Sequence, residues 1–184
     1  MPDNPADKPD TGPVWMGTDD ALGDHDAVGV ADLIASGEIS AAEAVDAAIE
    51  RAERAEPLIA AFATTDFDRA RRRAGGPVEG RFGGLPTAIK DQTAVAGLPL
   101  GFGSQTLADA EPSATSSPIT EIFEAVGTIS LGTTTLPEFG LTSSSDFHHG
   151  PPTHNPWNRD HIAGGSSSGA AALVAAGVLP LAHG

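Results

Sequence analysis

The segment Leu85-Pro-Thr-Ala-Ile-Lys-Asp91 is a short apolar run that ends in a lysine and an aspartate. Its residue types predict a strand, GTISLGT (127–133) predicts a second one, and VLPLAHG (178–184) is expected to begin another. The segment ITEIFEAV (119–126), between the first two, has the spacing of a helix. Because helices and strands alternate along the chain, the sequence predicts an α/β fold.

The residues before the first strand are predicted to form a helical N-terminal layer. Asp26 is the expected N-cap of a short helix. Ser40 and Glu43 fit a capping box at the start of a second helix, and Pro57 is expected to end it. A third helix is predicted over 66–74.

The composition indicates a globular chain of one domain, since 40% of its 184 residues are hydrophobic and 19% are charged. The formal net charge of -15 disfavours nucleic acid and anionic membranes as partners. The absence of Cys excludes disulfides and Cys nucleophiles and is compatible with a cytoplasmic location. No apolar run reaches the ~18 residues of a membrane span. Residues 1–25 are predicted to form a disordered acidic arm, and 26–184 the ordered chain.

Lys90 is the first candidate for chemistry. The sequence has two lysines, and the other one, Lys8, lies in the predicted arm. Burial at the end of an apolar strand would lower the pKa of the ammonium group and make it a general base near neutral pH. The alternative is a structural lysine that pairs with Asp91 or with another carboxylate. The residues alone leave both hypotheses open.

The second candidate is AGGSSSGAAALVAAG (163–177), in which two glycines precede three serines and a helical pattern. Its simplest interpretation is a serine N-cap on an Ala-rich helix. A Walker phosphate loop is excluded because the segment has no lysine, and a nucleophile elbow is disfavoured because the preceding strand is poor. A lysine at a strand end and serines framed by glycines together suggest Ser–Lys hydrolytic chemistry.

Four segments, in this order and at these spacings, resemble the amidase signature family: GGLPTAIKD (83–91), GTTTLPEFG (132–140), HNPWN (154–158) and AGGSSSGAAALVAAGVLPLAHG (163–184). The resemblance implies an α/β/α fold with a mixed central sheet and helices on both faces. The ending His-Gly is similar to that of 6-aminohexanoate cyclic dimer hydrolases. Family members are more than twice as long, so the resemblance implies that residues 26–184 are the N-terminal portion of an incomplete domain.

The resemblance also implies a Ser–Ser–Lys triad that hydrolyses a carboxamide C–N bond. Lys90 matches the general base, and Ser166 matches the middle serine, which follows a cis peptide bond in the family and relays the proton. We therefore expect their side chains within about 2.6–3.2 Å of each other. The family's nucleophilic serine follows the position of Gly184 and has no match here. This chain alone is expected to be inactive and marginally stable or prone to aggregation.

Two other functions stay open. The A subunit of the tRNA-dependent amidotransferase uses the same triad to release ammonia from glutamine, and it needs partner subunits. The other alternative is an inactive truncated remnant. For the amidase, the resemblance implies a small-molecule amide substrate, no metal and no organic cofactor, and it allows a homodimer.

A few positions depart from the family's pattern or suggest other chemistry. Ser168 stands where members usually carry Gly, and Thr133 where many carry Lys. The loop 141–149 is expected to shape the substrate pocket, as it does in the family. A metal cluster is the weaker interpretation of four side chains in and after this loop, because adjacent histidines point in different directions. These side chains are Asp146, His148, His149 and His154.

Overall fold

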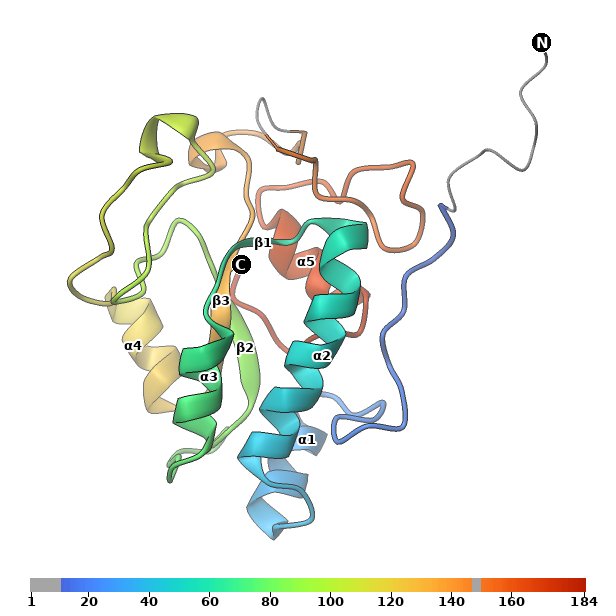
Figure 1. Cartoon of the computed structure of the whole chain (residues 1–184), viewed down its shortest axis with the longest axis vertical. Helices are drawn as coiled ribbons and strands as arrows, with labels where there is room; N and C mark the ends of the chain where they lie inside the picture. The colour runs from blue at the N-terminus through green and yellow to red at the C-terminus, as the bar shows by residue number, and fades with distance from the viewer. Residues whose placement is uncertain (1–10, 147–149) are drawn as a thin grey trace.

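The computed structural model describes residues 11–146 and 150–184 (Figure 1). A three-stranded sheet lies at its centre, in the order β1 (Phe62–Thr65), β3 (Ile129–Thr134), β2 (Pro86–Lys90). Strands β2 and β3 are parallel, whereas β1 pairs antiparallel with β3. The predicted α/β class and the mixed sheet are therefore confirmed.

Helices pack on both faces of this sheet. The α-helices are α1 (Ala27–Ser36), α2 (Ala41–Ile59), α3 (Phe67–Ala74), α4 (Pro118–Ala125) and α5 (Ser168–Ala175). Two short 3-10 helices are η2 (Gln105–Leu107) and η3 (Glu138–Gly140). The main core joins α1, α2, α3 and α5 to one face of the sheet, where Ala88 and Leu131 lie. On the other face, Ile89 packs with Phe123 of α4, and Figure 1 shows α4 and α5 on opposite sides of the sheet.

Helix α2 begins as predicted but ends later. The Ser40 hydroxyl accepts a hydrogen bond from the Glu43 N–H at 3.1 Å, and the Glu43 carboxylate accepts one from the Ser40 N–H at 2.8 Å. The helix continues through Pro57 to Ile59, so the prediction that Pro57 ends it is wrong. The proline lies in the last turn, where its missing N–H removes a single helical hydrogen bond.

The strand predictions hold for β2 and β3, but two other segments differ. Strand β1 was not predicted, because its four residues lie at the sheet edge and alternate only between half-buried and exposed positions. Residues 178–184 were expected to begin a strand, and they form none. They still run beside β2, since the His183 N–H donates to the Ala88 carbonyl at 2.9 Å and the Thr87 hydroxyl donates to the Leu181 carbonyl at 3.1 Å.

Residues 11–25 are packed against the body of the protein. Val14 and Leu22 are buried, and the Met16 N–H donates to the Ala176 carbonyl at 2.7 Å. The prediction of a disordered arm is therefore wrong for this stretch, because a few apolar side chains are enough to anchor it. The rest of that prediction, residues 1–10, lies outside the described residues.

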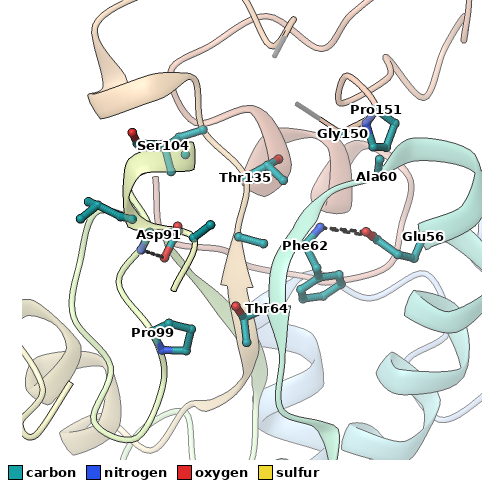
Figure 2. Close-up of a pocket in the computed structure, with 16 residues that line it drawn as sticks. Glu56, Ala60, Phe62, Thr64, Asp91, Pro99, Ser104, Thr135, Gly150 and Pro151 are labelled. Carbon is teal, nitrogen blue, oxygen red and sulfur yellow. Dashed lines mark hydrogen bonds between the residues drawn. The ribbon is translucent and has the colours of Figure 1, made fainter. Parts of the chain in front are cut away.

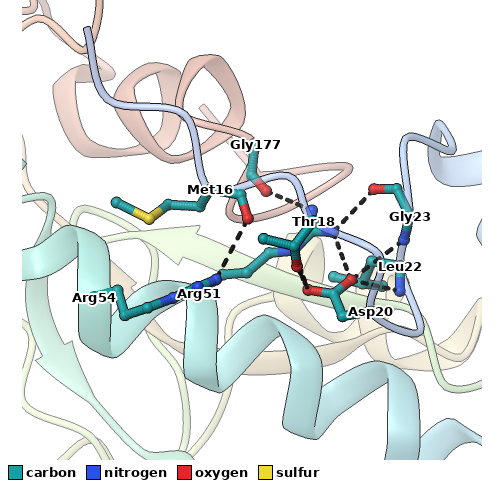
Figure 3. A network of polar contacts seen from close by, with 8 residues as sticks. All are labelled: Met16, Thr18, Asp20, Leu22, Gly23, Arg51, Arg54 and Gly177. Atoms are coloured by element: carbon teal, nitrogen blue, oxygen red, sulfur yellow. Dashed lines mark hydrogen bonds and ion pairs between the residues drawn. The ribbon is translucent and has the colours of Figure 1, made fainter.

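Arg51 on α2 is the polar centre of this packing (Figure 3). Its side chain is buried, and its Nε donates to the Asp20 carboxylate at 2.8 Å. Nη1 donates to the Gly177 carbonyl at 2.7 Å, and Nη2 donates to the Gly23 carbonyl at 2.9 Å. One guanidinium therefore joins the N-terminal segment, α2 and the turn after α5.

We expect Arg51→Met to lower the free energy of unfolding by about 3–5 kcal/mol, because it removes the charge partner of the Asp20 carboxylate and the donor to the Gly23 and Gly177 carbonyl groups. Arg54→Met is the matched control on the same helix. Arg54 is exposed and makes one long bond, at 3.4 Å, so its loss should cost less than about 0.5 kcal/mol. Urea unfolding followed by circular dichroism measures both. Equal losses in the two variants would contradict the role given to Arg51.

Candidate active site

Lys90 and the serine turn meet at the carboxyl end of β2. The Lys90 side chain is 4% exposed, and its Nζ donates to Ser166 Oγ at 2.8 Å. Nζ also donates to Ser167 Oγ at 3.0 Å. The predicted proximity of Lys90 and Ser166 is thus confirmed across 76 residues of sequence. The contact with Ser167 was missed, although the run of three serines gave a signal for it.

The backbone around the serines has the predicted geometry. The Gly165–Ser166 peptide bond is cis, as the family resemblance implied. Ser167 occupies the N-cap position of α5, but its hydroxyl makes no capping bond. The N-cap interpretation therefore gives the correct position for Ser167, but its hydroxyl binds Lys90 and does not cap the helix.

Ser168 and Gly169 fit α5 against the sheet. The Ser168 hydroxyl donates to the Gly164 carbonyl at 2.7 Å, and its backbone is helical, so the serine at this position introduces no left-handed strain. A Cβ on Gly169 would lie 2.0 Å from the Ala61 carbonyl oxygen and 2.7 Å from the Thr135 nitrogen. Only glycine permits this close approach, which holds the serine turn at the end of the sheet.

Lys90 forms no ion pair with any of the described residues. Asp91 follows it directly, and successive residues of a strand point to opposite faces. The Asp91 carboxylate instead accepts a hydrogen bond from the Gly101 N–H at 3.1 Å. The pairing of Lys90 with Asp91 is therefore absent, and burial lowers the pKa of the Lys90 amine.

A cavity of about 430 Å³ opens near Asp91 (Figure 2). Asp91 and Glu56 lie at opposite sides of it, whereas Lys90 and Ser166 do not line it. Burial raises the pKa of Asp91 to about 6, although backbone N–H groups that hydrogen-bond to it act in the opposite direction. Burial also raises the pKa of Glu56, which accepts from the Ala61 N–H at 3.0 Å. Both carboxyl groups are thus shifted toward their neutral form.

The predicted loop is described only in part. Gly140 and residues 142–143 lie beside the serine turn, since a Cβ on Gly165 would be 3.2 Å from the Thr142 oxygen and one on Gly140 would be 3.8 Å from the Ser166 Cβ. These contacts place the start of the loop next to Ser166. A role of the loop 141–149 in substrate binding stays a prediction.

The weaker metal hypothesis gains no support from the described part of the chain. His148 and His149 lie outside the described residues. The His154 ring binds the Arg159 carbonyl through Nδ1 at 2.8 Å. In residues 11–146 and 150–184, no group of three or more His, Asp or Glu side chains is arranged to hold a metal ion. None of the described helices is both long enough and apolar enough to cross a membrane.

Two curated proteins illustrate the similarity of this chain to known sequences. The sequence profile of the family described as Amidase matches residues 43–184. AmiC of Mycobacterium tuberculosis is 48% identical over 169 residues, which are 90% of this chain and 35% of AmiC. The A subunit of the glutamyl-tRNA(Gln) amidotransferase of Halothermothrix orenii is 38% identical over 153 residues, which are 83% of this chain and 32% of that protein.

Two solved structures share the fold. A structure of 6-aminohexanoate cyclic dimer hydrolase complexed with substrate gives a TM-score of 0.83 at 32% identity and covers 87% of this chain and 33% of that one. A bacterial aryl acylamidase of the amidase signature family gives 0.80 at 35% identity and covers 86% of this chain and 34% of that one. The predicted fold and the similarity to cyclic dimer hydrolases are confirmed. The chain spans about a third of the length of these relatives.

The raised pKa of Asp91 predicts a specific pH dependence of stability. Between its ordinary value of 3.8 and about 6, the folded state binds more protons at Asp91 than the unfolded state does. Stability contributed by this group therefore falls as the pH rises through that window.

In Asp91→Asn the amide oxygen still accepts from Gly101, and no charge forms. The unfolding free energy of the variant should rise relative to the wild type by up to about 3 kcal/mol between pH 4 and pH 7, since one pKa unit corresponds to about 1.4 kcal/mol. Urea unfolding at several pH values measures the difference. A difference that does not change with pH would show that Asp91 ionises as in water.

Proposed function

The chain belongs to the amidase signature family, and from this premise we propose that it provides the base and the proton relay of an amidase that hydrolyses carboxamide C–N bonds. The observation that carries the proposal is the 2.8 Å hydrogen bond between Lys90 Nζ and Ser166 Oγ at a buried strand end. The resemblance assigns these two side chains as general base and middle serine. The nucleophilic serine and the oxyanion donors are proposed to come from a segment that has no match in residues 1–184.

In the proposed reaction, Lys90 begins as a neutral amine with one lone pair. In this neutral state the 2.8 Å contact is reversed, so that the Ser166 hydroxyl donates to the Nζ lone pair while Nζ still donates to Ser167 Oγ at 3.0 Å. A nucleophilic serine attacks the amide carbonyl, its proton passes to Ser166, and the proton of Ser166 passes to Lys90. When the C–N bond breaks, the same path returns a proton to the leaving amine. Water then hydrolyses the acyl-enzyme by the same route and releases the carboxylic acid.

The lowered pKa of Lys90 supports this role. An ammonium group could not accept a proton, and burial favours the uncharged amine. The ion pair that would keep Lys90 charged is absent among the described residues. The geometry and the direction of the pKa shift therefore favour the base over the structural lysine.

The similarity to the A subunit of the amidotransferase carries a second candidate function. In that case the same residues would release ammonia from glutamine, and partner subunits would be required. The net charge of -15 disfavours direct contact with tRNA. Ammonia release that depends on glutamine and on a co-purifying partner protein would distinguish this function from that of a free-standing amidase.

The 184-residue chain by itself should not hydrolyse simple amides, because the oxyanion donors make the largest electrostatic contribution to catalysis and have no counterpart here. The test is release of ammonia from acetamide and benzamide and ring opening of a cyclic dipeptide. Turnover that disappears in Ser166→Ala or Ser167→Ala would contradict the proposal and would make a local serine the nucleophile.

A chimera tests the assigned roles directly. It joins residues 1–184 to the part of AmiC that this chain does not match, and we expect it to hydrolyse amides. Lys90→Met should lower kcat by about 10²–10⁴, the range that general acid–base groups contribute. Ser168→Ala is the matched control, since its hydroxyl binds the Gly164 carbonyl and not Lys90. If Lys90→Met retains kcat within about tenfold, another group is the base. A chimera that folds but hydrolyses no amide would favour the inactive remnant.

A further inference from the structure

His183 satisfies the free edge of β2 in an unusual way. The N–H of Asp91 points toward β3 and donates to the Thr134 carbonyl at 3.1 Å. At the opposite edge, the Ala88 carbonyl accepts from the His183 N–H at 2.9 Å. The N–H of Lys90 then donates to Nδ1 of the His183 ring at 3.3 Å. The imidazole thus stands where a neighbouring strand would offer a carbonyl group.

Helix α4 fixes the position of this ring. Phe123 meets it edge to face, with the ring centroids 5.5 Å apart and the planes at 82°. Phe123 itself packs against Ile89 of β2, on the face opposite the serine turn. The ring of His183 is therefore held from two sides, by α4 and by the backbone of Lys90.

Only one form of the imidazole can make this contact. Nδ1 accepts a hydrogen bond, so it carries the lone pair and the proton is on Nε2. A doubly protonated ring has no acceptor and would place a positive charge near Lys90. Burial lowers the pKa of His183, and Lys90 lowers it further whenever its amine is charged. On α4, Glu121 and Glu124 are exposed to solvent, and the pKa of His183 is not shifted by them.

We propose that His183 is a positioning residue for Lys90: its neutral ring holds the backbone at the end of β2, and its protonation releases that backbone. Through this hold, the ring fixes the amine against Ser166 and Ser167. The role of Lys90 as a general base rests on the proposed function. The hydrogen bond between the Lys90 N–H and the His183 ring does not depend on that role. The consequence for the site is a loss of order at Lys90 in mildly acidic solution.

Two variants separate the acceptor from the titration. In His183→Asn, the amide oxygen lies near the position of Nδ1 and accepts a hydrogen bond without gaining a proton. His183→Leu keeps a side chain of similar bulk and removes the acceptor. Amide resonances of the 184-residue chain, observed by NMR between about pH 5 and pH 8, report on the Lys90 N–H directly. No turnover is needed, so failure of this test and failure of the proposed function are distinguishable.

In the wild type, the Lys90 amide shift should follow the titration of the His183 ring, and its hydrogen exchange should be faster than expected at low pH. In His183→Asn the Lys90 amide shift should respond only to the neighbouring carboxyl group of Asp91, whose pKa is about 6, and no longer to the residue at position 183. In His183→Leu the protection of the Lys90 amide should fall about tenfold, the loss expected for one hydrogen bond. The Asp91 amide, bonded to β3, is the internal control and should keep its protection.

Two outcomes would overturn the proposal. One is a Lys90 amide shift that, in the wild type, does not change as the His183 ring titrates. The other is unchanged protection of the Lys90 amide in His183→Leu. If His183→Leu also exposes the Asp91 amide, β2 has opened as a whole, and the comparison of the wild type with His183→Asn decides the question.

Discussion

The close approach of α5 to the sheet is the constraint on which the site depends. It requires Gly169, because any side chain there would collide with the Ala61 carbonyl group. The Gly169 N–H uses this proximity to donate to the Thr135 carbonyl at 3.1 Å. With the helix seated in this way, the turn before it places two serine hydroxyls on the amine of Lys90. A packing contact between backbones thus fixes the geometry of the polar groups.

The sheet also separates two neighbouring residues of opposite chemistry. Lys90 points to the serine turn, whereas Asp91 lines the cavity, which Lys90 does not reach. Burial shifts the pKa of each toward its neutral form, down for the amine and up to about 6 for the carboxyl group. Since neither one neutralises the other, each keeps its own proton equilibrium. The alternation of a strand therefore produces two separate titratable sites from one dipeptide.

Local signals in the sequence predict much of this structure. The capping box at Ser40 and the apolar runs around β2 and β3 need only their own residues to be recognised. Strand β1 is too short and too exposed to carry a pattern. The family resemblance predicts the contact of Lys90 with Ser166. The role of His183 as a hydrogen-bond acceptor could not be predicted. A single side chain that takes the place of a backbone carbonyl produces no repeating pattern of residues in the sequence.

The reach of Arg51 has a consequence for how the chain assembles. Two of its hydrogen-bond partners, Asp20 and Gly23, precede Arg51 in the sequence. The third partner, the Gly177 carbonyl, is synthesised 126 residues after Arg51. At a synthesis rate of about 5–20 residues per second, roughly 6 to 25 s pass between the synthesis of Arg51 and that of Gly177. During this interval α2 presents its alanine-rich face without α5 to cover it. The length of this interval is set by the 126 residues that separate Arg51 from Gly177.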